Sequence, residues 1–105
     1  MATELIGGVE LHVDDEGFMT DPSEWSEELA PTLAKEIGID ELTDTHWTVI
    51  RFLREDFAKE GQTATLRRVS TMAGVPIKDL YQLFPKKPAK KMSYVAGLHK
   101  PVGCV

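Results

Sequence analysis

The single cysteine of the chain, Cys104, is the penultimate residue of a sequence of 105 residues. A thiol this close to the chain end, after Pro101 and Gly103, is hard to bury in a core, so its position favours an accessible side chain. An accessible thiol with thiolate character is a nucleophile. It can accept a sulfur atom as a persulfide and deliver that sulfur elsewhere. These properties suit a carrier better than an enzyme with a fixed pocket.

The histidines and glycines provide no second chemical motif. His12, His46 and His99 lie far apart in the sequence, without the short His or Cys spacings typical of metal sites. His12 is expected on the polar face of a strand, and His46 is interpreted as a hydrogen-bonded structural residue. Gly7-Gly8 lacks the lysine and the following helix of a phosphate loop, and no serine nucleophile elbow is present. We therefore expect no metal, no cofactor and, with one cysteine, no internal disulfide.

Charge is distributed unevenly along the chain. Residues 1–60 carry sixteen acidic and four basic side chains, a net charge of −12. Residues 61–105 carry one acidic and eight basic side chains, a net charge of +7, so the total is −5. This asymmetry suggests that one face meets an anionic partner. The alternative is that the two halves pack together and compensate each other, and the sequence leaves both open.

Length and composition indicate one small globular domain. Hydrophobic residues make up 42% of the chain and charged residues 28%, and a chain of this size buries roughly 60–68% of its unfolded surface. No apolar run approaches the ~20 residues that a transmembrane helix needs. The N-terminus lacks the basic start and the apolar stretch of a secretion signal. We expect a cytoplasmic protein that makes no membrane contact.

The first element expected is a β-hairpin, because residues 4–19 alternate apolar and polar side chains. Two turns are possible, at Gly7-Gly8 and at residues 14–17. We take the second as the main hairpin turn, since Gly17 supplies the positive φ that a longer hairpin loop needs.

A first helix is expected after Asp21-Pro22, with Ser23 as its cap. Pro31 would kink or restart this helix because its ring removes a backbone donor. The apolar face has a four-residue spacing and consists of Trp25, Leu29, Leu33 and Ile37. Gly38 ends the segment.

Four more helices are predicted. The longest, residues 44–60, is capped by Thr43 and stopped by Gly61. Three shorter ones cover residues 65–73, 77–84 and 88–96. The helix over residues 65–73 is expected to turn Leu66, Val69 and Met72 or Ala73 inward. The inner face of the helix over residues 77–84 consists of Ile77, Leu80, Tyr81 and Phe84, with the Tyr81 hydroxyl at the rim. The helix over residues 88–96 has Ala89, Met92 and Ala96 on its inner face.

These elements together predict a mainly α fold of the α+β class: a small helical bundle with an N-terminal β-hairpin, a helix-turn-helix-like corner and a flexible C-terminal arm. Residues 1–97 would form the single domain. Residues 98–105 would form the mobile arm that carries the thiol, because they contain proline and glycine and have no helical or strand periodicity.

The corner around Gly74-Val75-Pro76 has the dimensions of a DNA-binding helix-turn-helix. Arg67, Arg68 and Lys78 could contact phosphates there. Asp79 on the groove-facing side and the acidic total charge argue against DNA binding, and many small helical proteins use such a corner only for packing. A DNA-binding regulator is kept as an alternative function.

A distinctive motif occupies the C-terminal segment: Leu83-Phe84-Pro85-x-x-Pro88-x-Lys90, then Ala96-Gly97-Leu98-x-Lys100-Pro101-x-Gly103-Cys104-Val105. It resembles the DsrC/TusE family of small sulfur carriers, which end in a penultimate cysteine on a mobile arm. The resemblance spans nearly the whole chain and includes Gly17-Phe18, Trp25, His46-Trp47, Phe52-Leu53 and Arg67. It implies the same helical bundle with an N-terminal hairpin.

By this resemblance the chain is a sulfurtransferase-type carrier rather than a stand-alone enzyme, and Cys104 receives a persulfide sulfur and passes it on. In TusE-type members the sulfur feeds 2-thiolation of the tRNA wobble uridine, between a TusBCD donor complex and a tRNA thiouridylase. In DsrC-type members the arm inserts into the dissimilatory sulfite reductase and works with a second cysteine eleven residues upstream.

The chain departs from the family pattern at several positions. Ser93 stands where the second cysteine would be, so two-thiol chemistry is excluded. The missing second cysteine argues against a DsrC-type member, whereas the stretch from Met72 to Tyr81 is short, as in DsrC of sulfite reducers. These two observations disagree about the subtype. Lys87 stands where glycine is common, and His99 where proline is usual.

Arg67, Lys90 and Lys100 are the best supporting residues, because a thiolate or persulfide arm that returns to the body gains from nearby cations. Each could instead be a solvated surface charge. Besides sulfur carriage and DNA binding, a third function is a docking subunit whose tail enters a larger reductase without using the thiol.

Overall fold

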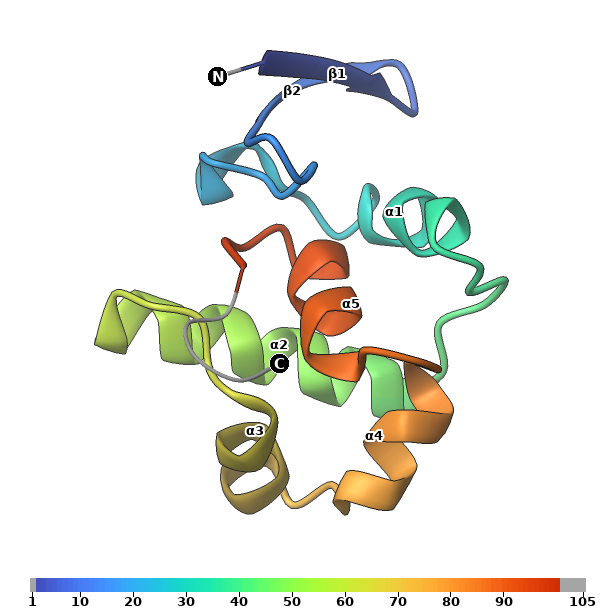
Figure 1. Cartoon of the computed structure of the whole chain (residues 1–105), viewed down its shortest axis with the longest axis vertical. Helices are drawn as coiled ribbons and strands as arrows, with labels where there is room; N and C mark the ends of the chain where they lie inside the picture. Colours follow the sequence, from blue (N-terminus) through green and yellow to red (C-terminus); the bar gives the residue numbers. More distant parts are fainter. Residues whose placement is uncertain (1, 101–105) are drawn as a thin grey trace.

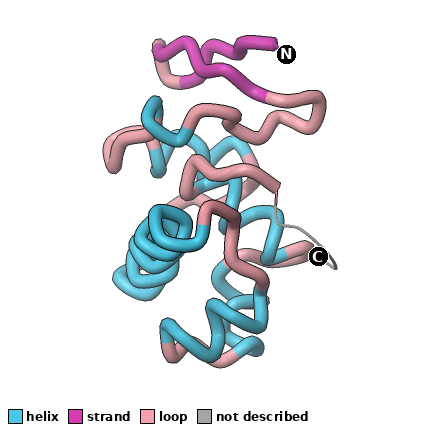
Figure 2. The backbone as a smooth tube through the Cα atoms, turned by 90° about the vertical axis from the view of Figure 1, so that its left-hand side faces the viewer, coloured by secondary structure: helices cyan, strands magenta, loops and turns pink. Residues whose placement is uncertain are grey.

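The computed structural model describes residues 2–100 of the chain, and the sequence-based fold class is confirmed: a two-stranded hairpin precedes a bundle of short helices (Figure 1). The elements in chain order are β1 (Ala2–Ile6), β2 (Val9–Val13), the 3-10 helix η1 (Pro22–Glu24), α1 (Ala30–Glu36), α2 (Asp44–Glu60), α3 (Leu66–Ala73), α4 (Ile77–Leu83) and α5 (Pro88–Val95). The hairpin lies at one end of the molecule, and α3 and α4 lie at the other end (Figure 2).

The hairpin turns at Gly7-Gly8, so the prediction that residues 14–17 form the main turn is wrong. The two strands pair antiparallel on either side of this glycine pair. Both glycines have positive φ, +59° and +80°, and a two-residue turn of the type that matches strand twist needs positive φ at both central positions. Residues 14–17 form a second, smaller reversal, closed by a single bridge between Val13 and Met19.

The segment after the hairpin forms two short helices rather than one. Asp21, not Ser23, caps η1, because its carboxylate accepts hydrogen bonds from the Ser23 amide at 3.0 Å and the Ser23 hydroxyl at 2.6 Å. α1 starts anew at Ala30 with Pro31 in its first turn, where a missing N–H costs no hydrogen bond. The expected restart at Pro31 is therefore confirmed. Trp25 falls between the two helices.

α2 is the central helix, and its predicted boundaries are confirmed. At its start the Thr43 hydroxyl accepts from the His46 amide at 3.4 Å, and His46 Nδ1 accepts from the Thr43 amide at 3.0 Å. Gly61 ends it with a φ of +75°. Since Nδ1 is an acceptor, His46 Nε2 carries the proton and donates to the carbonyl oxygen of Leu83 at 2.8 Å. The structural role expected for His46 is confirmed.

Two apolar clusters hold these elements together. The larger one lies between the helices and contains Ala30, Ala34, Ile39, Val49, Ile50, Leu53, Ala64, Val69, Val75, Leu80, Phe84, Ala89, Met92, Val95, Ala96 and Leu98. The smaller one lies under the hairpin and contains Ile6, Leu11, Val13, Met19, Leu29 and Leu33. Trp25 and Tyr94 pack against both clusters. These two aromatic side chains therefore join the hairpin to the bundle.

The predicted inner face of α4 is only half right. Leu80 and Phe84 are fully buried, but Ile77 is 41% exposed and Tyr81 is 52% exposed. Of the two alternatives predicted for the end of α3, Met72 is 58% exposed and Ala73 packs against the core. The apolar stripe of α4 is wider than the surface on which the helix packs, so Tyr81 is not a core residue.

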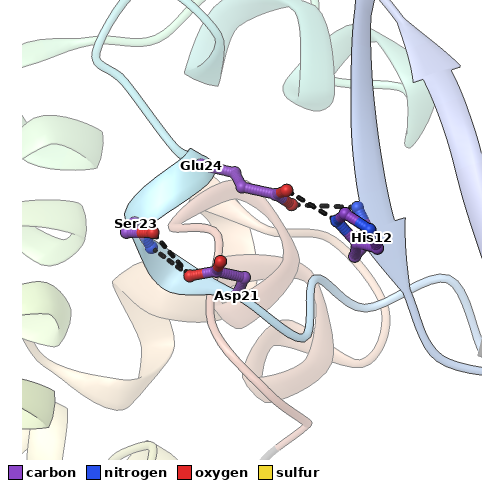
Figure 3. A network of polar contacts seen from close by, with 4 residues as sticks. All are labelled: His12, Asp21, Ser23 and Glu24. Carbon is purple, nitrogen blue, oxygen red and sulfur yellow. Dashed lines mark hydrogen bonds and ion pairs between the residues drawn. The ribbon is translucent and has the colours of Figure 1, made fainter.

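A polar network ties the hairpin to η1 (Figure 3). His12 Nδ1 lies 2.7 Å from one carboxylate oxygen of Glu24, and the His12 amide donates to the other at 2.9 Å. The hydrogen bond and the charge of Glu24 raise the pKa of His12. The hydrogen bonds from the His12 amide and ring lower the pKa of Glu24. His12 is exposed on the polar side of its strand, as expected.

Gly97, directly after α5, lies against the indole of Trp25. A Cβ at this position would lie 2.4 Å from Trp25 Cδ1, and Gly97 has a φ of +71°. The Trp25 indole N–H also donates to the carbonyl oxygen of Val95 at 2.8 Å. Only glycine satisfies both the space and the backbone conformation here.

We expect Gly97→Ala to destabilise the fold by about 2–4 kcal/mol, because the new methyl group overlaps the Trp25 ring and takes a strained φ. Gly38→Ala is the matched control, since Gly38 has a φ of +87° and nothing within 4 Å of a Cβ. It should cost only about 1 kcal/mol. Urea unfolding measures both, and equal losses would contradict the proposed contact.

The His12–Glu24 pair predicts a pH dependence of stability. The pKa of His12 is raised by folding, so the stabilisation is complete below the unfolded pKa of about 6.5 and is lost as pH rises through the folded pKa. The lowered pKa of Glu24 keeps its carboxylate ionised over this range. Between about pH 6 and about pH 8, the free energy of unfolding should therefore fall more in the parent chain than in His12→Gln. The same slope in both proteins would rule out the pair as its source.

Candidate functional site

The candidate site is the start of the C-terminal segment, where α5 ends and the chain turns back over the body. Leu98 is 1% exposed, and its amide donates to the carbonyl oxygen of Ser93 at 3.0 Å. Cys104, the predicted sulfur-carrying residue, lies outside the described residues. The geometry of the site is therefore that of its base, from Gly97 to Lys100.

His99 and Lys100 continue the contact with the body. The carbonyl oxygen of His99 accepts a hydrogen bond from the Thr63 hydroxyl at 2.8 Å, and its ring Nε2 donates to the Thr20 carbonyl at 3.1 Å. Lys100 Nζ lies 3.1 Å from a carboxylate oxygen of Glu16. The structure thus places the first three residues of the predicted arm, 98–100, against the body, and the other five fall outside the described residues.

Arg54 fixes this base from the side of α2. Its Nη1 donates to the carbonyl oxygen of Ala96 at 2.8 Å, and its Nη2 donates to that of Pro22 at 3.0 Å. The guanidinium carbon lies 4.2 Å from the centre of a Trp25 ring, a cation–π contact. Burial lowers the pKa of Arg54, but a guanidinium keeps its charge in a protein. The cation also lies at the C-terminal end of α5, where the helix dipole favours it.

The sequence analysis did not identify Arg54 as a site residue. Arg51 and Arg54 are both arginines on α2, three residues apart, and nothing in the local sequence separates them. In the structure Arg51 is an exposed partner of Glu27 at 3.5 Å. Arg51 also lies over the ring of Trp47, at 5.5 Å from its centre. The two arginines therefore differ in the distant groups that Arg54 reaches, two carbonyl oxygens and the indole of Trp25.

One of the three predicted supporting cations pairs with Glu16, and a second lines the same cleft as Glu16. Lys90 lines a cleft of about 360 Å³ together with Glu16, Phe18 and Tyr94. Lys100 pairs with Glu16. The third cation, Arg67, is exposed on α3 and lies outside this cleft. The structure therefore pairs Lys100 with Glu16 and places Lys90 on the wall of the cleft that Glu16 also lines, but it does not bring Arg67 to this cleft.

Ser93 is fully buried, and its hydroxyl is already engaged. The hydroxyl donates to the carbonyl oxygen of Ala89 one turn earlier at 2.7 Å. This is the usual local bond of a serine inside a helix. The residue that stands in place of a second cysteine thus has a packing role in α5.

The loop into α5 has an unusual backbone. Lys86 and Lys87 both have positive φ, +58° and +38°, a conformation that costs a residue with a Cβ roughly 1–2 kcal/mol. Glycine adopts it without this cost, which accounts for glycine being common at position 87 in the family that the sequence resembles.

Two ion pairs join the acidic and basic halves of the chain. Glu16 pairs with Lys100, and Asp56 binds Arg68 through two hydrogen bonds of 2.7 and 3.0 Å. The Asp56 side chain is only 5% exposed, and its hydrogen bond raises the pKa of Arg68. Part of the charge asymmetry is therefore neutralised inside the fold, and Arg68 is not available for a phosphate contact.

Residues 2–100 contain no helix long and apolar enough to cross a membrane. Over the same residues, no group of three or more His, Cys, Asp or Glu side chains is placed to hold a metal ion.

Comparisons with known proteins agree with this geometry. A family model described as DsrC like protein matches residues 5–105. The sulfurtransferase TusE of Salmonella paratyphi A is 40% identical over 96% of this chain and 98% of its own length. Among solved structures, dissimilatory sulfite reductase I (DsrI) gives a TM-score of 0.86 at 32% identity and covers 99% of this chain and 100% of its own. The oxidized gamma-subunit (DsrC) from Archaeoglobus fulgidus gives 0.80 at 37%, with the same coverage.

Arg54→Lys tests the contact that fixes the base of the arm. A lysine cannot bond two carbonyl groups in different directions while it stacks on an indole, so we expect a loss of about 1–3 kcal/mol in the free energy of unfolding. Arg51→Lys is the matched control, because an exposed pair contributes about 0–1 kcal/mol. Amide hydrogen exchange at residues 96–98 should also accelerate only in Arg54→Lys. Unchanged exchange there would contradict the role assigned to Arg54.

Proposed function

The chain belongs to the DsrC-like protein family, and we propose that Cys104 is the residue through which it acts as a sulfur carrier. The observation that carries this proposal is the match of the family along residues 5–105, which includes the penultimate cysteine. Similarity to a sulfurtransferase over almost the full length of both chains supports the same role.

The chemistry is thiol–persulfide exchange. The Cys104 thiolate attacks the outer sulfur of a donor persulfide, a new S–S bond forms, and the donor leaves as a thiolate. Cys104 then carries the sulfur as a persulfide. An acceptor nucleophile takes the outer sulfur, and Cys104 leaves as a thiolate. The outer sulfur moves without net oxidation or reduction, so the relay needs no cofactor.

The body supplies a fixed origin and nearby cations. We propose residues 1–97 as the single domain and residues 98–105 as the mobile arm that carries the thiol, with the contacts of Leu98, His99 and Lys100 as the origin of the arm on the body. Four residues further on, Cys104 can lie at most about 14 Å from Lys100. Lys100 pairs with Glu16 at this origin, and Lys90 lines the cleft that Glu16 also lines. Both cations would favour the thiolate or the persulfide anion. Arg67, on α3, is the third cation proposed for this role.

The partners are proteins. A donor complex of the TusBCD type and a tRNA thiouridylase acceptor form one candidate pair, and the dissimilatory sulfite reductase is the other candidate. Ser93 favours a single-thiol relay over an arm that works with two cysteines, since its hydroxyl is buried and bonded within α5. The cytoplasm is the proposed compartment, as for a relay among such enzymes.

Intact mass spectrometry after incubation with a small-molecule persulfide tests the carrier chemistry. We expect the parent chain to gain one sulfur atom that a reductant removes, and Cys104→Ala to gain none while its circular dichroism is unchanged. Ser93→Ala is the control at the position where DsrC-type members have their second cysteine, and it should take up sulfur like the parent chain. An unmodified parent chain whose thiol still reacts with an alkylating agent would contradict the proposal.

The docking alternative predicts a different result for Cys104→Ala. A subunit that only docks its tail would bind its partner equally well with and without the thiol and would carry no sulfur. Pull-down with Cys104→Ala, read together with the mass result, separates the two functions.

A further inference from the structure

Three exposed apolar side chains gather at the corner between α3 and α4. Met72 is 58% exposed, Ile77 is 41% exposed and Tyr81 is 52% exposed. Ile77 and Tyr81 lie one turn apart on the solvent side of α4, and Met72 lies just before the turn that joins the two helices. Across residues 2–100, only five large hydrophobic side chains are exposed, and the other two are Leu5 and Val9 on the hairpin. Clustered exposure of this kind marks a surface that contacts something else.

The packing of the corner does not require these side chains. Leu80 and Phe84 are fully buried and attach α4 to the core. The hydrogen bond from His46 Nε2 to the Leu83 carbonyl, 2.8 Å long, fixes the end of α4 against α2. The backbone of the corner is therefore held in place before a partner binds, so that less conformational entropy is lost on binding.

One exposed cation borders this patch. Lys78 is exposed, follows Ile77 directly and lies three residues before Tyr81, so it borders the patch on the same side of α4. The corner belongs to the half of the chain with a net charge of +7. Tyrosine and methionine are enriched at the centre of protein interfaces, and charged side chains such as Lys78 belong to the polar rim. The complementary surface would be apolar with carboxylates around it.

The same corner is poorly suited to DNA. A helix that enters a groove needs polar side chains for the base edges and free cations for the phosphates. Here α4 presents Ile77, Tyr81 and the acidic Asp79, and Arg68 is bound to Asp56 by two hydrogen bonds. The observations favour a protein over a nucleic acid.

We propose that the α3–α4 corner, formed by Met72, Ile77 and Tyr81 with Lys78 at its rim, is the surface on which an acidic, apolar face of the sulfur-transfer partner docks. The inference rests on the proposed function, since a carrier must meet its partner. The corner and the hairpin lie at opposite ends of the molecule (Figures 1 and 2). In a symmetric dimer a second copy of the chain would bring a second Lys78 to the patch rather than carboxylates, so a second copy is not the occupant we assign.

Binding of the full-length chain to two purified probes tests this surface: a TusBCD-type donor complex and a dissimilatory sulfite reductase, each immobilised under reducing conditions. The test variant is Ile77→Ser/Tyr81→Ser. The matched control is Leu5→Ser/Val9→Ser, which removes the other exposed apolar pair at the far end. On the probe that the parent chain binds, we expect the corner variant to bind about tenfold more weakly or worse, and the control to stay within about threefold.

A second variant, Lys78→Glu, leaves the apolar side chains in place and keeps the test decisive if the double variant does not fold. It should slow association and change the dependence of the association rate on salt, because the rim charge steers the encounter. Both corner variants should take up sulfur from a small-molecule persulfide at the parent rate.

Other outcomes would overturn the proposal. Parent-like affinity of the corner variants would exclude this surface as the docking site. A dimer of the parent chain that dissociates in the corner variant would assign the patch to a second copy. Loss of DNA retardation in the corner variant alone would assign it to nucleic acid. If the parent chain binds neither probe, the proposed partners themselves are contradicted, and that result is distinguishable from a failure of the surface alone.

Discussion

The contact between Trp25 and Gly97 is the constraint on which the arrangement of the chain depends. The indole fits because position 97 has no Cβ, which would otherwise lie 2.4 Å from the ring. Its N–H binds the end of α5, and Arg54 stacks on its face while bonding carbonyl groups of η1 and α5. Since Trp25 also packs against both apolar clusters, one side chain joins the hairpin, the central helix and the base of the arm.

The residues that follow Gly97 are attached to the body by successively weaker contacts. Leu98 is buried in the core, His99 is held by two hydrogen bonds, and Lys100 is held by one exposed ion pair of a kind that contributes about 0–1 kcal/mol. The attachment weakens from Leu98 to Lys100. The proposed carrier needs this combination, because Cys104 would have to reach another protein while the rest of the molecule stays folded and keeps the proposed docking surface in place.

The sequence predicted best what is encoded locally. Caps and glycines located α2, α3 and α5, and the position of Cys104 indicated a carrier before any resemblance was considered. It failed where two local signals competed or where a distant contact decides. Both candidate hairpin turns contain glycine, and the apolar stripe of α4 does not show that packing stops before Tyr81. Arg54 differs from Arg51 through distant groups, two carbonyl oxygens and the indole of Trp25. The departures on α4 are also the positions that form the proposed docking surface.

The most direct test of the central claim, that the folded body presents the arm to a partner, compares the intact chain with a synthetic peptide of residues 98–105. The rate of sulfur transfer is measured for each from a small-molecule persulfide and from a persulfide-loaded TusBCD-type donor complex. The account predicts similar rates from the small donor, and transfer from the protein donor that is at least about tenfold faster to the intact chain. Equal rates from the protein donor would contradict it.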